Sequence, residues 1–136
     1  MTSDLTCMAA TILIADDYKD NLELLRLLLG AADYQVREAR NGAECLTLAR
    51  QQRPDLIMVD LSMPVMDGWE VFRELKADER TASVPCVAVT AHGDSDRNRA
   101  LQAGFNAYLS KPFRGVELLE TVARLLSPPQ ATTYGS

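Results

Sequence analysis

Hydrophobic and polar positions along the 136-residue chain form two alternating kinds of segment. Short, nearly continuous apolar runs predict five strands, at residues 11–15, 34–38, 56–59, 84–89 and 107–110. Apolar residues at helical spacing predict a helix after each strand, at 21–32, 43–51, 69–77, 95–103 and 115–126. Strict alternation of this kind predicts an α/β fold around a parallel sheet, and continuous apolar strands are typical of a sheet with helices on both faces.

The same periodicity predicts which helical side chains face the core. The inward positions are Leu22, Leu25, Leu28 and Leu29 in the first helix, Cys45, Leu46 and Ala49 in the second, Trp69, Val71, Phe72 and Leu75 in the third, and Val116, Leu119, Val122, Ala123 and Leu126 in the last. No internal repeat or second domain is evident. We therefore expect one domain at residues 11–126, an N-terminal extension at 1–10 and a loose tail at 127–136.

Composition and charge narrow the functional classes. With 47% hydrophobic and 24% charged residues, the chain can form a core, and its net charge of -5 argues against a general nucleic-acid or anionic-membrane binder. No apolar run reaches the roughly 20 residues of a membrane helix, and the first residues lack the features of a signal peptide. Cys7, Cys45 and Cys86 show no metal or redox spacing, which suggests reduced thiols and a cytoplasmic protein.

Polar side chains with useful chemistry follow four of the predicted strands. Asp16 and Asp17 follow the first strand, Asp60 the third, Thr90 the fourth and Lys111 the fifth. Taken singly, each has an ordinary explanation as a cap, a strand residue or a surface charge. Open parallel sheets bind ligands at the carboxyl ends of their strands, so the combination predicts one shared site.

The chemistry of that set points to phosphoryl transfer with a metal. Three close carboxylates repel one another, and Mg²⁺, or Mn²⁺ in its place, would offset the repulsion through carboxylate oxygens and waters. Asp60 could then attack phosphorus and form an aspartyl phosphate. Lys111 could hold one phosphoryl oxygen, and the Thr90 hydroxyl could donate to another.

Four sequence pieces carry a resemblance to a known family. They are ILIADD, LIMVDLSMPVMDG, VAVTA and AYLSKPF, and their order and spacing are very specific. From about residue 11 to 126 the chain resembles the response-regulator receiver domains of two-component signalling. The resemblance implies a flavodoxin-like fold with strand order 2-1-3-4-5, acting as a signalling switch and not as an enzyme.

The resemblance also implies a role for each site residue. Asp16 and Asp17 would bind the metal together with the Ser62 carbonyl, and Asp60 would be both a metal ligand and the phosphoacceptor. Lys111 would be the lysine of the site, in a peptide bond to proline that is commonly cis in the family.

Further positions would carry the signal outward. Thr90 would be the switch hydroxyl, and Tyr108 the aromatic residue that changes rotamer on activation. Ser62 and His92 occupy positions that modulate phosphoryl loss. Trp69 would lie near the site as a fluorescent reporter.

Partners follow from the same resemblance. A histidine kinase or histidine phosphotransfer protein would donate the phosphoryl group. The surface of the fourth helix, fifth strand and fifth helix would bind a downstream protein or a second copy, without direct contact to nucleic acid or membrane.

Three other interpretations stay open at this point. The chain could be the receiver module of a hybrid kinase or a phosphorelay intermediate, although its start at Met1 weakly favours a stand-alone protein. A haloacid-dehalogenase-like phosphohydrolase uses similar groups, but its second Asp follows the first by two residues, where this chain has Tyr18. A flavodoxin-like nucleotide or flavin carrier needs a phosphate cradle that Asp16 and Asp17 would oppose.

Overall fold

The computed structural model describes residues 9–91 and 94–126. Cys7, His92 and the predicted tail lie outside the described residues, as does most of the predicted N-terminal extension. Strands and helices alternate, as β1 (Thr11–Ala15), α2 (Lys19–Ala31), β2 (Gln35–Ala39), α3 (Gly42–Gln51), β3 (Leu56–Asp60), α4 (Gly68–Ala77), β4 (Cys86–Thr90), α5 (Asp94–Ala103), β5 (Ala107–Ser110) and α6 (Gly115–Leu126).

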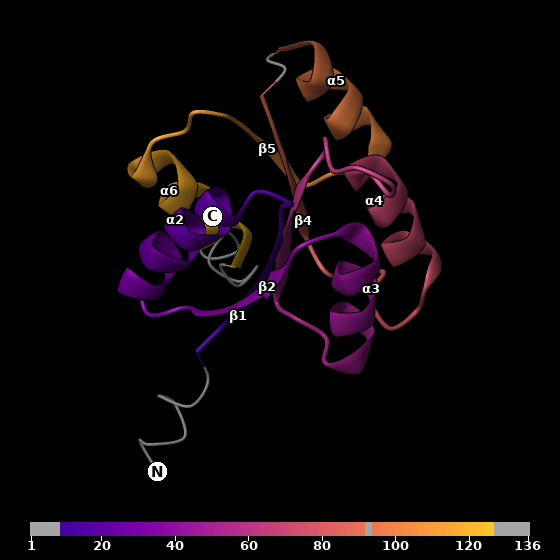
Figure 1. The fold of residues 1–136 in the computed structure, drawn as a ribbon, viewed down its shortest axis with the longest axis horizontal. Helices are drawn as coiled ribbons and strands as arrows, with labels where there is room; N and C mark the ends of the chain where they lie inside the picture. The colour runs from indigo at the N-terminus through magenta and orange to yellow at the C-terminus, as the bar shows by residue number, and fades with distance from the viewer. Residues whose placement is uncertain (1–8, 92–93, 127–136) are drawn as a thin grey trace, which may run out of the picture.

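The five strands form one parallel sheet in the order β2-β1-β3-β4-β5, which confirms the predicted topology. Figure 1 shows α2 and α6 on one side of this sheet and α3, α4 and α5 on the other. Each side has its own apolar cluster: Leu22 and Leu118 belong to the first, and Cys45 and Val71 to the second. Because both faces are covered, the central strands β3 and β4 are buried along their full length.

Two element boundaries differ from the sequence-based expectation by two residues, and the others agree to within one residue. Helix α2 begins at Lys19, two residues before the predicted start. Strand β4 begins at Cys86 instead of residue 84. Pro85 has no N–H to contribute to the sheet, although its carbonyl accepts a hydrogen bond from the backbone N of Ile57 at 3.0 Å.

The inward face of α6 was partly mispredicted. Val116 is 65% exposed and Ala123 is also exposed, whereas Leu118 is fully buried beside Val122. Apolar residues are spread around this helix, so several stripes are compatible with its periodicity. The buried face of α6 includes Thr121, which the hydrophobic pattern did not place there because threonine is polar. Its burial is tolerated because the Thr121 hydroxyl donates to the Glu117 carbonyl within the helix at 2.9 Å.

No helix within residues 9–91 and 94–126 combines the length and apolar character of a membrane-spanning segment.

The segment between β3 and α4 is fixed by a cap at the start of α4. The Asp67 carboxylate accepts from the Glu70 backbone N at 3.0 Å, and the Glu70 carboxylate accepts from the Asp67 backbone N at 3.3 Å. This reciprocal pair anchors the loop that follows the end of β3.

Gly68, the first residue of α4, allows this helix to pack directly against the end of β3. A Cβ atom here would lie 2.7 Å from the Asp60 carbonyl oxygen and 2.8 Å from the Leu61 Cα. We predict that Gly68→Ala lowers the free energy of unfolding by about 1–3 kcal/mol, since backbone atoms must shift to make room. Urea denaturation measures this change.

Gly30→Ala provides the matched control, because a Cβ at Gly30 meets nothing within 4 Å. In a helix this substitution should raise the free energy of unfolding by about 0.5–1 kcal/mol. Equal effects of the two substitutions would contradict the close approach at Gly68.

Candidate functional site

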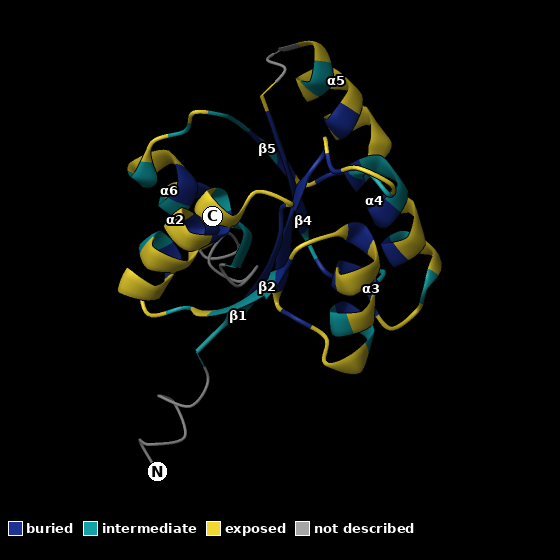
Figure 2. Ribbon diagram, in the orientation of Figure 1, coloured by how far each residue is buried: buried dark blue, intermediate teal, exposed yellow. Residues whose placement is uncertain are grey.

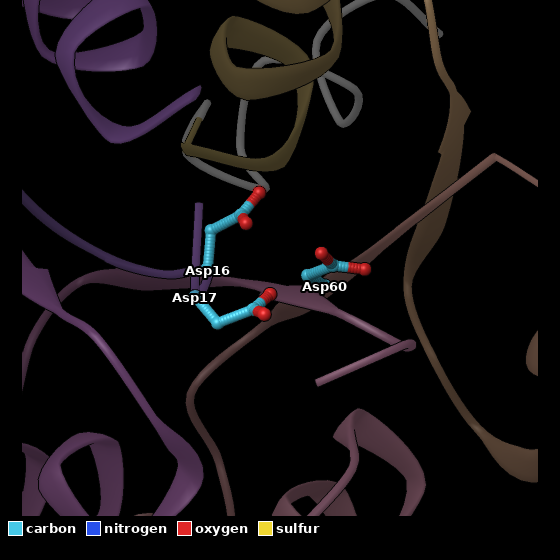
Figure 3. Close-up of side chains that lie close together, drawn as sticks. All are labelled: Asp16, Asp17 and Asp60. Atoms are coloured by element: carbon cyan, nitrogen blue, oxygen red, sulfur yellow. The ribbon is translucent and has the colours of Figure 1, made fainter. Parts of the chain in front are cut away.

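Three carboxylates meet where β1 and β3 end. These strands are parallel neighbours, with Ala15 paired to Val59, so Asp16 and Asp60 emerge side by side at the same edge. Asp17 follows directly on Asp16. Figure 3 shows the three side chains converging, and oxygen atoms from all three lie within 4.8 Å of one another. The predicted acidic cluster is therefore present.

The carboxylates differ in exposure and in their local hydrogen bonds. Asp16 is only 1% exposed and Asp60 6%, whereas Asp17 is open to solvent. Asp16 accepts from the Tyr18 backbone N at 2.9 Å and from the Asn21 side-chain amide at 3.2 Å. The Tyr18 N–H binds Oδ1 and the Asn21 amide binds Oδ2, so both oxygens of the Asp16 carboxylate are held in place.

The Asp60 carboxylate is held in a similar way by the turn that follows β3. Its Oδ1 atom accepts a hydrogen bond from the Ser62 backbone N at 2.9 Å. The predicted role of the Ser62 carbonyl as a metal ligand stays a prediction.

Lys111 bridges the two buried carboxylates. Its Nζ atom lies 3.1 Å from Asp16 Oδ2 and 3.1 Å from Asp60 Oδ2. Burial opposes the charged form of Lys111, but attraction by the two carboxylates outweighs it and raises the pKa of the amine. Burial, with a smaller contribution from Asp60, raises the pKa of Asp16, although the Tyr18 N–H and Lys111 act in the opposite direction.

Backbone pairing places this lysine at the site. The Lys111 backbone N donates to the Thr90 carbonyl at 2.8 Å, which continues the β4–β5 ladder beyond its last strand pair. The predicted cis peptide bond between Lys111 and Pro112 is present. Lys111, directly after β5, thus contacts the carboxylates that stand at the ends of β1 and β3.

The donor set suits a divalent cation. One ammonium group faces three carboxylates, so the cluster has an excess of negative charge even with Lys111 in place. Grouped carboxylate oxygens, one of them open to solvent, are the ligands that Mg²⁺ prefers, since this ion keeps several waters.

Thr90 lies at the end of β4 and is fully buried. Its hydroxyl donates to the Asp96 carboxylate in α5 at 3.2 Å, a contact that the sequence did not predict. Tyr108 is half-buried in β5, opposite Ala88 of β4. The Trp69 ring packs edge-on against Phe105 at 5.9 Å, and its use as a reporter of the site stays a prediction.

Comparison with known proteins identifies the class. The response regulator receiver domain family matches residues 12–123 of the chain. The polar-differentiation response regulator DivK of Brucella anthropi is 39% identical over 120 residues, which make up 88% of this chain and 98% of DivK.

Solved structures of receivers are also similar. The chemotaxis response regulator CheY4 of Vibrio cholerae has a TM-score of 0.82 at 29% identity, over 88% of this chain and 100% of that one. The receiver domain of the sensor histidine kinase PA1611 from Pseudomonas aeruginosa PAO1 has a TM-score of 0.80 at 35% identity, over 87% and 98%. That structure holds a magnesium ion coordinated in its active site cleft.

The chain therefore belongs to the response regulator receiver domain family. It is a phosphoacceptor of two-component signalling, and the cluster of Asp16, Asp17 and Asp60 is its phosphorylation site. Receiver domains interact with histidine kinases. Membership of this family makes the chain a signalling switch and rules out the phosphohydrolase and the flavin or nucleotide carrier.

The contact between Lys111 and Asp60 can be tested by a double-mutant cycle. We predict that Lys111→Met and Asp60→Asn, measured singly and together by urea denaturation, give a favourable coupling of about 1–3 kcal/mol without metal. The physical reason is that both groups are largely shielded from water. Lys111→Met removes the cation that contacts Asp60, whereas Asp60→Asn leaves Lys111 with Asp16 as its only carboxylate partner in the described residues.

The exposed pair of Arg26 and Glu38, joined at 2.9 Å, is the control for this cycle. Its side chains are 51% and 35% exposed, and its coupling should stay below about 1 kcal/mol. A Lys111–Asp60 coupling no larger than that of the control would contradict the structural role given to Lys111.

Proposed function

We propose that Asp60 accepts the phosphoryl group within a receiver domain spanning residues 11–126. The observation that carries this proposal is the pair of 3.1 Å contacts from Lys111, which pin the buried Asp60 carboxylate inside the acidic cluster. Asp16, Asp17, Asp60 and the Ser62 carbonyl would hold Mg²⁺, with Mn²⁺ as a possible substitute. Bound there, the ion supplies charge neutralisation and polarises a phosphoryl oxygen.

The donor is a phosphohistidine of a histidine kinase or histidine phosphotransfer protein. An Asp60 carboxylate oxygen forms a bond to phosphorus while the bond from phosphorus to the imidazole nitrogen breaks, and the nitrogen keeps the electron pair. The Lys111 Nζ atom lies 3.1 Å from Asp60 Oδ2 and holds this carboxylate in place for the attack.

Lys111 is the group best placed to stabilise the product. Its amine already lies against Asp60 Oδ2, and a phosphoryl oxygen on Asp60 would offer it a new acceptor of higher charge. Because Asp16 Oδ2 also accepts from the same amine, Lys111 can turn from Asp60 to the phosphoryl group while it keeps one carboxylate partner.

The contact between Thr90 and Asp96 supports a route from the site to the surface. A phosphoryl oxygen on Asp60 would compete with the Asp96 carboxylate for the hydrogen bond from the Thr90 hydroxyl. The negative charge of the phosphoryl group would also repel that carboxylate. Losing this hydrogen bond releases α5, and Tyr108 can then repack in β5. The two arrangements need to differ by only a few kcal/mol for one modification to shift the population.

The surface of α5, β5 and α6 is the proposed output face, which binds a downstream protein or a second copy of the chain. This output involves neither nucleic acid nor membrane directly, and a cytoplasmic location is part of the proposal. A receiver within a hybrid kinase or a phosphorelay intermediate would use the same phosphorylation site. The resemblance to both DivK and the receiver of a sensor histidine kinase supports each of these contexts.

Phosphoryl uptake can be tested by intact-mass spectrometry after incubation with acetyl phosphate and Mg²⁺. We predict one added phosphoryl group on the natural chain and none on Asp60→Asn or in the presence of a chelator, since the amide is not a nucleophile of comparable strength. Asp33→Asn is the control, because Asp33 is exposed at a positive φ of 69° that Asn tolerates equally. Labelling that persists in Asp60→Asn would refute the assignment of the acceptor.

The route through Thr90 can be tested by hydrogen exchange of residues 94–110 before and after phosphorylation. We predict that Thr90→Val still takes up the phosphoryl group but loses most of the change in exchange across α5 and β5, because valine keeps the shape and lacks the hydroxyl. Thr47→Val is the control, since the Thr47 hydroxyl bonds only within α3, to the Ala43 carbonyl at 3.0 Å. An unchanged exchange response in Thr90→Val would contradict this route.

A further inference from the structure

A groove between α4 and α5 lies apart from the acidic cluster and shares only helix α5 with the proposed output face. Its volume is about 830 Å³, and its lining includes Trp69, Phe72, Arg73, Glu74 and Lys76 of α4 and Arg99 of α5. Both helices lie on the same side of the sheet (Figure 1). None of its lining residues belongs to the phosphorylation site, so the groove calls for an explanation of its own.

The floor of this groove is aromatic and well packed. The Phe72 and Phe105 rings stack with centroids 4.0 Å apart, and Trp69 meets Phe105 edge-on. Trp69 remains half-buried, so part of its ring is open to the groove. Rigid aromatic surface of this kind lowers the entropy cost of binding an apolar side chain.

The walls of the groove are positively charged, although the whole chain has a net charge of -5. Arg73 projects from α4, and Arg99 from α5 lies 4.3 Å from the centroid of the Trp69 ring. In the part of the chain that the structure describes, neither guanidinium forms an ion pair. Lys76 adds a third charge, although its amine is bound to the carbonyls of Ala82 and Val84.

The one acidic side chain of the groove does not neutralise these charges. Glu74 instead faces Arg50 of α3 at 3.6 Å. Helix α5 buries only Ala100 within its described residues, and Figure 2 shows it exposed along most of its length. The groove therefore combines two guanidinium groups that have no ion pair in the described residues, a partly open aromatic surface, and a helix, α5, that buries little of its own surface.

We propose that this groove is a docking site for an acidic amphipathic helix of a partner protein. Its carboxylates would pair with Arg73 and Arg99, and an aliphatic or aromatic side chain would rest on Trp69 and Phe72. The two walls are ten-residue helices, about 15 Å long, which matches roughly three turns of a bound helix with anchors at positions i, i+3 or i+4, and i+7.

Trp69 is the only tryptophan of the chain, so its fluorescence reports directly on the groove. The probe is a synthetic 14-residue helical peptide with Leu and Phe on one face and Glu on the other, titrated into the full chain. Its matched counterpart has Lys in place of every Glu. We expect saturable binding of the acidic peptide and binding at least about tenfold weaker for the Lys peptide, with an affinity that falls as salt increases.

Variants then link binding to the two arginines. Arg73→Gln combined with Arg99→Gln should weaken binding of the acidic peptide by about tenfold or more, whereas Arg26→Gln, an exposed arginine of α2, should leave it unchanged. Circular dichroism checks that each variant is folded, and both changed residues are exposed.

Several outcomes would overturn the proposal. No fluorescence change up to millimolar peptide, equal binding of the two peptides, or unchanged binding by the double variant would each do so. Sedimentation showing a dimer that the double variant abolishes would assign the groove to a second copy of this chain. Binding of pyrophosphate or ATP that displaces the peptide and depends on both arginines would assign it to a small anionic ligand instead.

Discussion

The electrostatic balance at the ends of β1 and β3 is the constraint on which the rest of the structure depends. Asp16 and Asp60 are almost completely buried within a few ångströms of each other, and Asp17 adds a third charge. Lys111 offsets part of this repulsion through two contacts of 3.1 Å. Folding therefore concentrates negative charge that the chain compensates only in part. This excess favours binding of a cation, which would in turn offset the repulsion between the carboxylates and an anionic phosphoryl group.

The sheet makes this arrangement possible. Because these strands are parallel, the carboxyl ends of β1, β3, β4 and β5 lie at one edge of the sheet. Residues as far apart in the sequence as Asp16 and Lys111 therefore meet there. Buried, continuous strands hold the register, because a slip by one residue would move every side chain to the opposite face. Under the proposed function, the helices, and α5 above all, would respond when the charge at the site changes.

Helix α5 has a particular place in this scheme. It buries little apolar surface in its described residues, accepts the Thr90 hydrogen bond through Asp96, and forms one wall of the cationic groove through Arg99. A weakly packed helix needs little free energy to move, so small changes at the end of β4 can alter the surface it presents. The phosphorylation site and the two proposed binding surfaces thus share one adaptable element.

The sequence alone determined the alternation of strands and helices, and with it the parallel sheet and the residues at the strand ends. That prediction succeeded because buried strands are continuous apolar runs, and because side chains just after parallel strands must gather at one edge. The motifs around Asp60 and Lys111 indicated the receiver family among the proteins with this fold, since their order and spacing are specific. The face of α6 was less well predicted, because apolar residues surround that helix and the buried Thr121 satisfies its hydroxyl within the helix.

Other features were decided only by the tertiary structure. The double contact of Lys111, the partner of Thr90 in α5 and the pairing of Glu74 with Arg50 join residues from different elements, and no local pattern encodes such distances. The aromatic groove likewise lies between α4 and α5, where Arg99 of one helix comes over the Trp69 ring of the other, and no sequence pattern predicts that contact. Local periodicity fixes which face of an element is apolar, whereas long-range packing fixes which charged groups end up with a partner and which remain free to bind one.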